Sequence, residues 1–442
     1  MGKEVINVWN FKFFKSIFSN AFNESLSKIM KSRLKLTKKK LGVGIVAIII
    51  VAALFIYIKP RLAQAITQLS SWSGVQASSS AAGQQTIVRT SNGTMIAFFS
   101  NVYALYYSTS TDGVTWSTAI GVSGGSVYTG NGYAVAIDSS DNIYISYVSP
   151  QPMLYVMKYA FSGGVLGTGT VVLSVSGTTS KPILAVNSLG AVVVNAAGST
   201  TTVSYITTNG GTGWSSAYTL DSSAATAAPL IAIGQAFYTL NNSNTILKDT
   251  TGAGAWTSTG VTVSSATGKP SLASTSSDAI DMIYQVSGST VSYQRYTIST
   301  NSLGGVTGLA GSVSTNGYSL TAAADGQMWA FYSLSNGHVA YVHYDGSSWD
   351  GTATDLGANP SGGSLVAASI SSALYMSSTG FLSVEWVTLS TSSYYQYIAS
   401  LNVTVSLGPT PTPTPTPSPT PIPDVNTQIN GGTIIKGGTL IK

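Results

Sequence analysis

Residues 131–147 read NGYAVAIDSSDNIYISY, and residues 316–332 read NGYSLTAAADGQMWAFY. Each stretch is a short apolar run, a polar turn, and a second run in which apolar and polar residues alternate. Alternation with a period of two residues is typical of β-strands, and the polar turn between the runs predicts a hairpin. The two copies therefore indicate an all-β domain built from a repeated unit.

The unit recurs between residues 85 and 405. The central residues of its first strand are spaced 41 to 49 positions apart: Val88, Ala136, Ala185, Ala232, Ala273, Ala322 and Ala367. A period near 45 residues with about four strands per unit is typical of a β-propeller blade, whose first strand lines a crowded central channel and favours small residues. We expect a propeller of six or seven four-stranded blades, with a stack of solenoid turns as the alternative fold.

The segment 59–84 precedes the repeats and contains Trp72. Its sequence around Trp72 resembles the outer strands that follow Trp116 and Trp349. We expect it to complete the last blade and close the ring, because closure removes an exposed strand edge.

The composition excludes several classes of site. The chain has no cysteine, so disulfides, thiolate metal sites and cysteine nucleophiles are excluded. Asp138 and Asp141 are candidates for contacts with Ca²⁺, but a polar turn accounts for them equally well. We therefore predict neither a cofactor nor a metal site.

The N-terminal region predicts a membrane anchor. Residues 41–58 are eighteen uncharged, mostly apolar residues, and a helix of that length spans about 27 Å, close to the hydrocarbon thickness of a bilayer. Residues 1–40 hold ten Lys or Arg against two Glu, and apolar residues recur among the lysines at helical spacing. This pattern predicts a basic amphipathic segment on the cytoplasmic side of the lipid bilayer, with the repeats outside. The alternative is a signal peptide cleaved after Ala65.

The positive charge is confined to this N-terminal region, so no nucleic-acid partner is predicted for the repeats. After the repeats, residues 409–423 alternate Pro with Thr or Ser and predict a stiff extended stalk. Residues 424–442 end in the tandem GGTIIK and GGTLIK, which we interpret as a β-prone tail for self-association or docking to a partner.

Four segments carry a turn signature of Asp or Asn, then Gly, then Trp. Its residues are Asp112, Gly113 and Trp116; Asn209, Gly211 and Trp214; Asp249, Gly252 and Trp256; and Asp345, Gly346 and Trp349. In such a turn the Asp side chain accepts backbone N–H bonds, Gly supplies a positive φ and Trp packs between sheets. These segments resemble the Asp boxes, or BNR repeats, of sialidase-like propellers. The resemblance implies that they are structural and lie away from the active face.

A second feature is similar to the same family. Residues 87–90, IVRT, followed by NGTMIAF at 92–98, resemble the first-strand Arg motif of sialidases. The resemblance implies that Arg89 is one of three arginines that grip a substrate carboxylate. Arg295 is the only other arginine between residues 85 and 401, so a third is missing. The family also pairs a Tyr nucleophile with a Glu, and Glu385 is the only Glu after the apolar segment.

Taken together, these patterns favour a membrane-anchored surface recognition or adhesion protein whose propeller binds glycans or a surface partner. A glycoside hydrolase is the first alternative and requires two carboxylates at the channel mouth, such as Glu385 with Asp138 or Asp281. A structural role in a surface layer, appendage or virion is the second. Sequons at Asn92, Asn241 and Asn402 are candidates for N-glycosylation.

Overall fold

The computed structural model describes one body of the chain, within the unit Ala65–Lys442. The described residues are 66–73 and 85–406, without 102–103, 124–131, 149–152, 223–227, 287–289, 312 and 367–368. The predicted cytoplasmic segment, the apolar segment 41–58, the stalk and the tail lie outside them. In the part of the chain that is described, no helix has the length and apolarity needed to cross a membrane.

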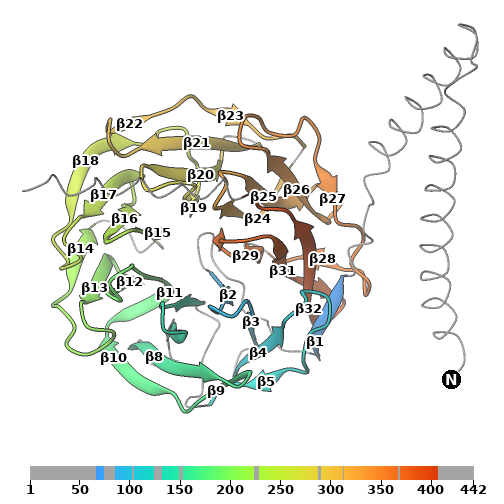
Figure 1. The fold of residues 1–442 in the computed structure, drawn as a ribbon, viewed down its shortest axis with the longest axis horizontal. Coiled ribbons are helices and arrows are strands. Elements are labelled where there is room, and N and C mark those ends of the chain that lie inside the picture. Colours follow the sequence, from blue (N-terminus) through green and yellow to red (C-terminus); the bar gives the residue numbers. More distant parts are fainter. Residues whose placement is uncertain are drawn as a thin grey trace, which may run out of the picture. The chain divides into compact units, whose positions relative to one another are not determined.

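The described residues form seven sheets arranged as a ring (Figure 1). Sheet 1 contains β2 (Ile87–Arg89), β3 (Met95–Ser100), β4 (Leu105–Ser110) and β5 (Ile120–Gly121). Sheet 2 contains β6 (Tyr133–Ile137), β7 (Asn142–Val148), β8 (Met153–Ser162) and β10 (Thr170–Ser176), with β9 (Val165–Leu166) paired to β8. Sheet 3 contains β11 (Thr178–Val186), β12 (Val192–Gly198), β13 (Thr202–Thr207) and β14 (Tyr218–Asp221). Sheet 4 contains β15 (Leu230–Ile233), β16 (Ala236–Leu240), β17 (Thr245–Asp249) and β18 (Thr257–Thr262).

The other three sheets have five strands each, as sheet 2 does. Sheet 5 contains β19 (Ser271–Ala273), β20 (Ala279–Gln285), β21 (Val291–Thr297) and, both paired to β21, β22 (Ser302–Leu303) and β23 (Thr307–Gly308). Sheet 6 contains β24 (Val313–Ala323), β25 (Met328–Leu334), β26 (Val339–Tyr344), β27 (Thr354–Asp355) and the inner β30 (Tyr375–Met376). Sheet 7 contains β28 (Ser364–Leu365), β29 (Ser371–Ser372), β31 (Gly380–Ser390), β32 (Ser393–Val403) and β1 (Thr67–Ser73). The molecule is a seven-bladed β-propeller, in which each sheet is one blade.

The ring closes through the N-terminal strand. β1 pairs antiparallel with β32, and Trp72 lies opposite Tyr394 in the register. This strand is the outer edge of sheet 7, the position expected for the segment around Trp72. The last blade thus combines strands from both ends of the propeller sequence, so sheet 7 cannot form its outer edge before residues 67–73 reach it.

Large side chains fill the space between neighbouring sheets. Tyr144, Tyr284, Tyr296, Tyr332 and Tyr397 are among the largest fully buried side chains. Where such a ring is buried its hydroxyl needs a partner, and Tyr332, for example, donates to the Ala310 carbonyl oxygen of the preceding blade. With no disulfide in the sequence, this apolar packing and the strand ladders hold the blades together.

The four Asp, Gly and Trp segments occupy equivalent places. Each forms the turn between the third and fourth main strands of its blade, in sheets 1, 3, 4 and 6. The backbone N–H groups of Thr115 and Val114 donate to the Asp112 carboxylate, which lowers the pKa of Asp112 to about 2. Asp345 accepts the equivalent bonds from Ser348 and Ser347, and its pKa is likewise lowered to about 2.

The other two turns use variations of this arrangement. Asp249 is fully buried and accepts the N–H groups of Thr251, Gly252 and Gly254, whereas Asn209 accepts the hydroxyl of Thr207. The indole N–H groups of Trp116 and Trp214 donate to the carbonyl oxygens of Gly113 and Gly211. Those of Trp256 and Trp349 are buried and have no hydrogen-bond partner among the described residues. These contacts hold the turns as rigid corners of their blades.

Three of these turns pack directly on the preceding blade. Gly113 has φ +68°, and a Cβ added to it would lie 2.4 Å from the Cβ of Phe381 in sheet 7. A Cβ on Gly211 would lie 3.0 Å from Val172 of sheet 2, and one on Gly254 would lie 2.8 Å from Ile206 of sheet 3. At these positions glycine is required both by its backbone conformation and by the lack of space.

Replacing Gly113 by Ala should lower the free energy of unfolding by about 2–5 kcal/mol, of which the left-handed backbone costs about 1–2 and the overlap with Phe381 about 1–3. Gly326→Ala is the matched control, because Gly326 has φ +85° but nothing within 4 Å of the added Cβ. It should cost only the backbone part, about 1–2 kcal/mol. Equilibrium urea unfolding measures both, and equal losses would contradict a tight contact between sheets 1 and 7.

Candidate functional site

A cavity of about 550 Å³ lies at the centre of the ring. Its walls are the inner strands of sheets 1 to 5 and the segment 373–377. Ala136, Ala185, Ala232 and Ala273, which the repeat alignment made equivalent, all line it. The expectation that small residues of the first strands face the channel is confirmed at these four positions.

Sheet 6 is screened from the cavity by an added strand. β30 pairs in parallel with the inner strand β24, with Tyr375 beside Ala322 and Met376 beside Ala323. The N–H groups of Ala322 and Ala324 also donate to the carbonyl oxygens of Leu374 and Met376. This segment places Tyr375, a 48% exposed aromatic residue, in the cavity wall.

Arg89 also lines the cavity, at the end of β2. Its Nε donates to the Gly93 carbonyl oxygen at 3.2 Å, and its Nη1 lies 3.6 Å from the sulfur of Met376. Among the described residues no carboxylate pairs with it. Partial burial lowers the pKa of Arg89, but a guanidinium stays charged at neutral pH. The cavity wall therefore contains a positively charged guanidinium that has no carboxylate counter-ion among the described residues.

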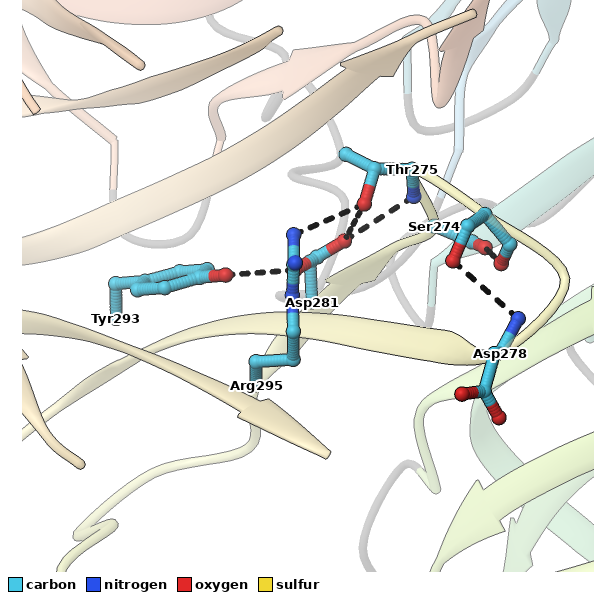
Figure 2. A network of polar contacts seen from close by, with 7 residues as sticks. Ser274, Thr275, Asp278, Asp281, Tyr293 and Arg295 are labelled. Carbon is cyan, nitrogen blue, oxygen red and sulfur yellow. Dashed lines mark hydrogen bonds and ion pairs between the residues drawn. The ribbon is translucent and has the colours of Figure 1, made fainter. Parts of the chain in front are cut away.

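The opposite wall is a polar loop, residues 274–278, held by a buried carboxylate. Figure 2 shows Asp281 of β20 at the centre of this network. Its carboxylate accepts the N–H and hydroxyl of Thr275 at 3.1 and 2.8 Å, the hydroxyl of Tyr293 at 2.7 Å, and Nε of Arg295 at 2.7 Å. Asp281 is fully buried, so these charge-assisted bonds fix the loop whose residues Ser274 to Ser277 face the cavity.

The side chain of Arg295 is engaged in this network. Its Nη2 also donates to the Thr275 hydroxyl at 3.0 Å. Its hydrogen bond and ion pair with Asp281 raise its pKa against the opposing effect of burial. The structure therefore gives Arg295 a supporting role in the loop, and it does not line the cavity with Arg89.

Glu385 lies elsewhere, in the interior between sheets 7 and 1. It is 2% exposed, accepts hydrogen bonds from the hydroxyl of Thr86 and the amide of Gln396, and does not line the cavity. Burial raises the pKa of Glu385 well above its ordinary value, because the low-dielectric interior disfavours the charged form. A carboxyl group without solvent access is unavailable to a substrate in the channel.

The register of sheet 1 also shows which end of the channel Arg89 faces. Arg89 lies opposite Met95, and Met95 lies opposite Ser110, the residue that begins the turn of Asp112. Arg89 is therefore at the same end of the blade as this turn. The resemblance to sialidases implies the reverse, a binding arginine on the face away from the Asp boxes.

The remaining predicted residues serve turns or lie on the surface. Asp138 accepts the N–H groups of Ser140 and Asn142, and Asp141 accepts the N–H and hydroxyl of Ser91 in the preceding blade. No group of three or more metal-ligating side chains occurs within the described ranges. Of the sequon residues, Asn92 and Asn402 are exposed and Asn241 is half-buried. Tyr375 and the loop 274–278 were missed from the sequence, where no repeat or motif distinguishes them.

Comparison with known proteins adds little beyond this description. No protein-family model and no curated protein matches the chain. Among solved structures, a mutant lectin of Aleuria aurantia in complex with Fucα1-6GlcNAc is similar at a TM-score of 0.44 and 13% identity, over 65% of this chain and 97% of the lectin. AofleA from Arthrobotrys oligospora has a TM-score of 0.47 and 12% identity, over 71% and 93%. The GH74 xyloglucanase of Xanthomonas campestris has a TM-score of 0.43 and 10% identity, over 62% and 46%. Similarities this distant say nothing about the ligand of this chain.

The burial of Glu385 predicts a pH-dependent stability. Because its folded-state pKa is raised, its contribution is fully present below the ordinary value of 4.5 and declines as the pH rises above it, by at most about 1.4 kcal/mol per pH unit. Glu385→Gln, which stays neutral, should lose less stability than the wild type between about pH 5 and about pH 8. Urea midpoints at the two pH values measure the difference. Parallel pH profiles would show that Glu385 is not protonated in the fold.

Proposed function

We propose that the protein is a membrane-anchored surface recognition protein that binds an acidic sugar of a glycan in the central channel. The observation that carries the proposal is the guanidinium of Arg89, which lines the cavity with no carboxylate partner among the described residues. A planar fork of N–H donors matches a carboxylate in two bonds, so a uronic or sialic acid supplies the missing counter-ion.

The other walls suit the rest of a sugar. Tyr375 offers an exposed aromatic ring in the cavity wall, and Ser274 to Ser277 offer hydroxyl groups on another wall. The C–H face of a pyranose packs on an aromatic ring, while its hydroxyls exchange hydrogen bonds with polar side chains. A volume of about 550 Å³ falls in the range of small-molecule sites and admits one or two sugar rings.

Binding is favoured over hydrolysis by the same lining. Glycosidases use two carboxyl groups that flank the bond to be broken. No Asp or Glu is among the described residues that line the channel cavity, and Glu385 is buried outside it. Among the described residues, the cavity lining therefore offers a guanidinium for an acidic sugar but no carboxyl group to act as acid or base.

The location follows from the sequence outside the described residues. The apolar run 41–58 lies between a lysine-rich segment and the propeller, as expected of an anchor that leaves the propeller outside the cytoplasm. The Pro/Thr stretch 409–423 and the β-prone tail 424–442 continue the chain beyond the propeller and provide a spacer and a docking segment.

Substituting Arg89 tests the proposal. The full chain, in a detergent without a sugar headgroup, is titrated with glucuronic, galacturonic and N-acetylneuraminic acids and with their methyl esters. We expect an acid to bind in preference to its ester, and Arg89→Gln to weaken that binding about ten- to hundredfold. Arg89→Lys keeps the positive charge but loses the two parallel N–H donors, so its affinity for the acid should lie between those of the wild type and Arg89→Gln.

A second variant moves the guanidinium without removing it. A Cβ on Gly380 would lie 2.9 Å from Nη2 of Arg89, so Gly380→Ala should also weaken acid binding. Acid binding that is unchanged in Arg89→Gln, or equal for acid and ester, would refute the assignment of this site.

A further inference from the structure

One junction between blades differs from the others that carry the Asp, Gly and Trp turn. At the junctions of sheets 7 and 1, 2 and 3, and 3 and 4, a turn glycine packs against a side chain of the preceding blade. At the junction of sheets 5 and 6, nothing lies within 4 Å of the corresponding position on Gly346. A cavity of about 540 Å³ is present there instead. We call it the 5/6 groove.

Three aromatic side chains form one side of the 5/6 groove: Tyr293 of sheet 5, and Tyr344 and Trp349 of sheet 6. The ring centroids of Trp349 lie 5.1 Å from Tyr293 and 5.3 Å from Tyr344, and Tyr293 and Tyr344 are 6.4 Å apart. All three residues are only partly buried, so ring surface is exposed to the groove. An aromatic cluster left open in this way differs from the tyrosines that fill the other junctions.

The cluster is fixed in place before any ligand arrives. The hydroxyl of Tyr293 donates to the buried Asp281 carboxylate at 2.7 Å, in the network of Figure 2. Tyr344 and Trp349 are joined by a β-bridge across one turn, in which Oδ1 of Asp345 accepts the N–H groups of Ser347 and Ser348. Rings that are already immobilised bind a partner with little further loss of conformational entropy.

The rim of the groove carries hydroxyl groups and one carboxylate. The side chains of Thr307, Ser348 and Asp350 line the groove and make no hydrogen bond to other described residues. No Lys or Arg is among the described residues of the lining. The groove therefore offers hydroxyls and a carboxylate acceptor, and no cationic side chain among its described residues.

We propose that the 5/6 groove is a second glycan site, which takes a neutral pyranose ring. The apolar C–H face of the sugar packs on Trp349 and the two tyrosines, and its hydroxyls donate to Asp350 and exchange hydrogen bonds with Ser348 and Thr307. Acidic sugars are disfavoured here by Asp350, in contrast to the channel with Arg89. The groove is separate from the channel and does not depend on the function proposed for it.

The test uses the full chain in a detergent without a sugar headgroup and the neutral methyl pyranosides of glucose, galactose, mannose, fucose and N-acetylglucosamine. Saturation-transfer NMR detects binding, and competition gives the affinity. We expect at least one of these sugars to bind, and Trp349→Ala to weaken it by about tenfold or more.

Two further variants separate binding from folding. Gly351 lies in the groove lining with open space around its Cβ position and an ordinary φ, so Gly351→Phe should fill the groove while the melting temperature stays unchanged. Trp214→Ala removes the equivalent tryptophan of sheet 3, whose turn is packed on Val172, and should leave sugar binding intact.

Arg89→Gln distinguishes the two sites, because it should weaken acid binding in the channel about ten- to hundredfold and leave neutral binding in the 5/6 groove unchanged. The proposal is overturned if none of the neutral pyranosides binds. It is equally overturned if the signal persists in a folded Gly351→Phe variant, or if Trp214→Ala weakens binding as much as Trp349→Ala.

Discussion

The pairing of β1 with β32 is the interaction on which the ring depends. Without it sheet 7 would lack its outer strand and end in an open edge. The first and last blades would then be held together by contacts such as those of Gly113 with Phe381 and of Thr86 with Glu385. The closing strand begins at Thr67, two residues after the alternative cleavage position Ala65. Both interpretations of the N-terminus, a retained anchor and a cleaved signal peptide, therefore leave the closing strand on the propeller.

Because the ring is closed, the gap between neighbouring blades widens from the axis outward, and the size of the side chains in the gap follows this widening. Small residues of the inner strands keep the axis open, while buried rings such as Tyr284 and Tyr332 fill the wider space further out. Where a turn glycine meets the preceding blade, as Gly113 meets Phe381, the fit leaves no room for a methyl group. At the junction of sheets 5 and 6, the equivalent turn glycine, Gly346, has no such contact with the preceding blade. The 5/6 groove occupies the space that side chains fill at the other junctions with this turn.

Much of the architecture could be predicted from the sequence because it is periodic. The spacing of Ala136, Ala185, Ala232 and Ala273 indicated both the blade length and the residues that face the channel. The turn residues Asp112 and Asp345 were recognisable because their hydrogen bonds are local, two or three residues along the chain. Whether these turns belong to the sialidase-like family stays a prediction.

The site was less predictable, because it depends on contacts between distant residues. β30 is two residues long and exists only through its pairing with β24, some fifty positions earlier, so Tyr375 carries no local signal. Glu385 lies in a strand that is buried on both faces, from Leu382 to Val387, so the alternation that separates buried from exposed positions is absent. The end of the channel that Arg89 faces follows from the register of sheet 1, which a motif match alone does not reveal.

The arrangement of the two proposed sites agrees with a surface role. A single sugar held by one arginine and one aromatic ring is bound weakly, and so is a neutral ring in an open groove. Two sites on one rigid propeller can engage neighbouring sugars of the same glycan, and the second contact then forms at high effective concentration. Copies of the chain crowded on a membrane would extend the same gain across a surface. If both proposals hold, two weak and chemically distinct sites on a rigid ring would select glycans that combine acidic and neutral sugars, a selectivity that neither site would provide alone.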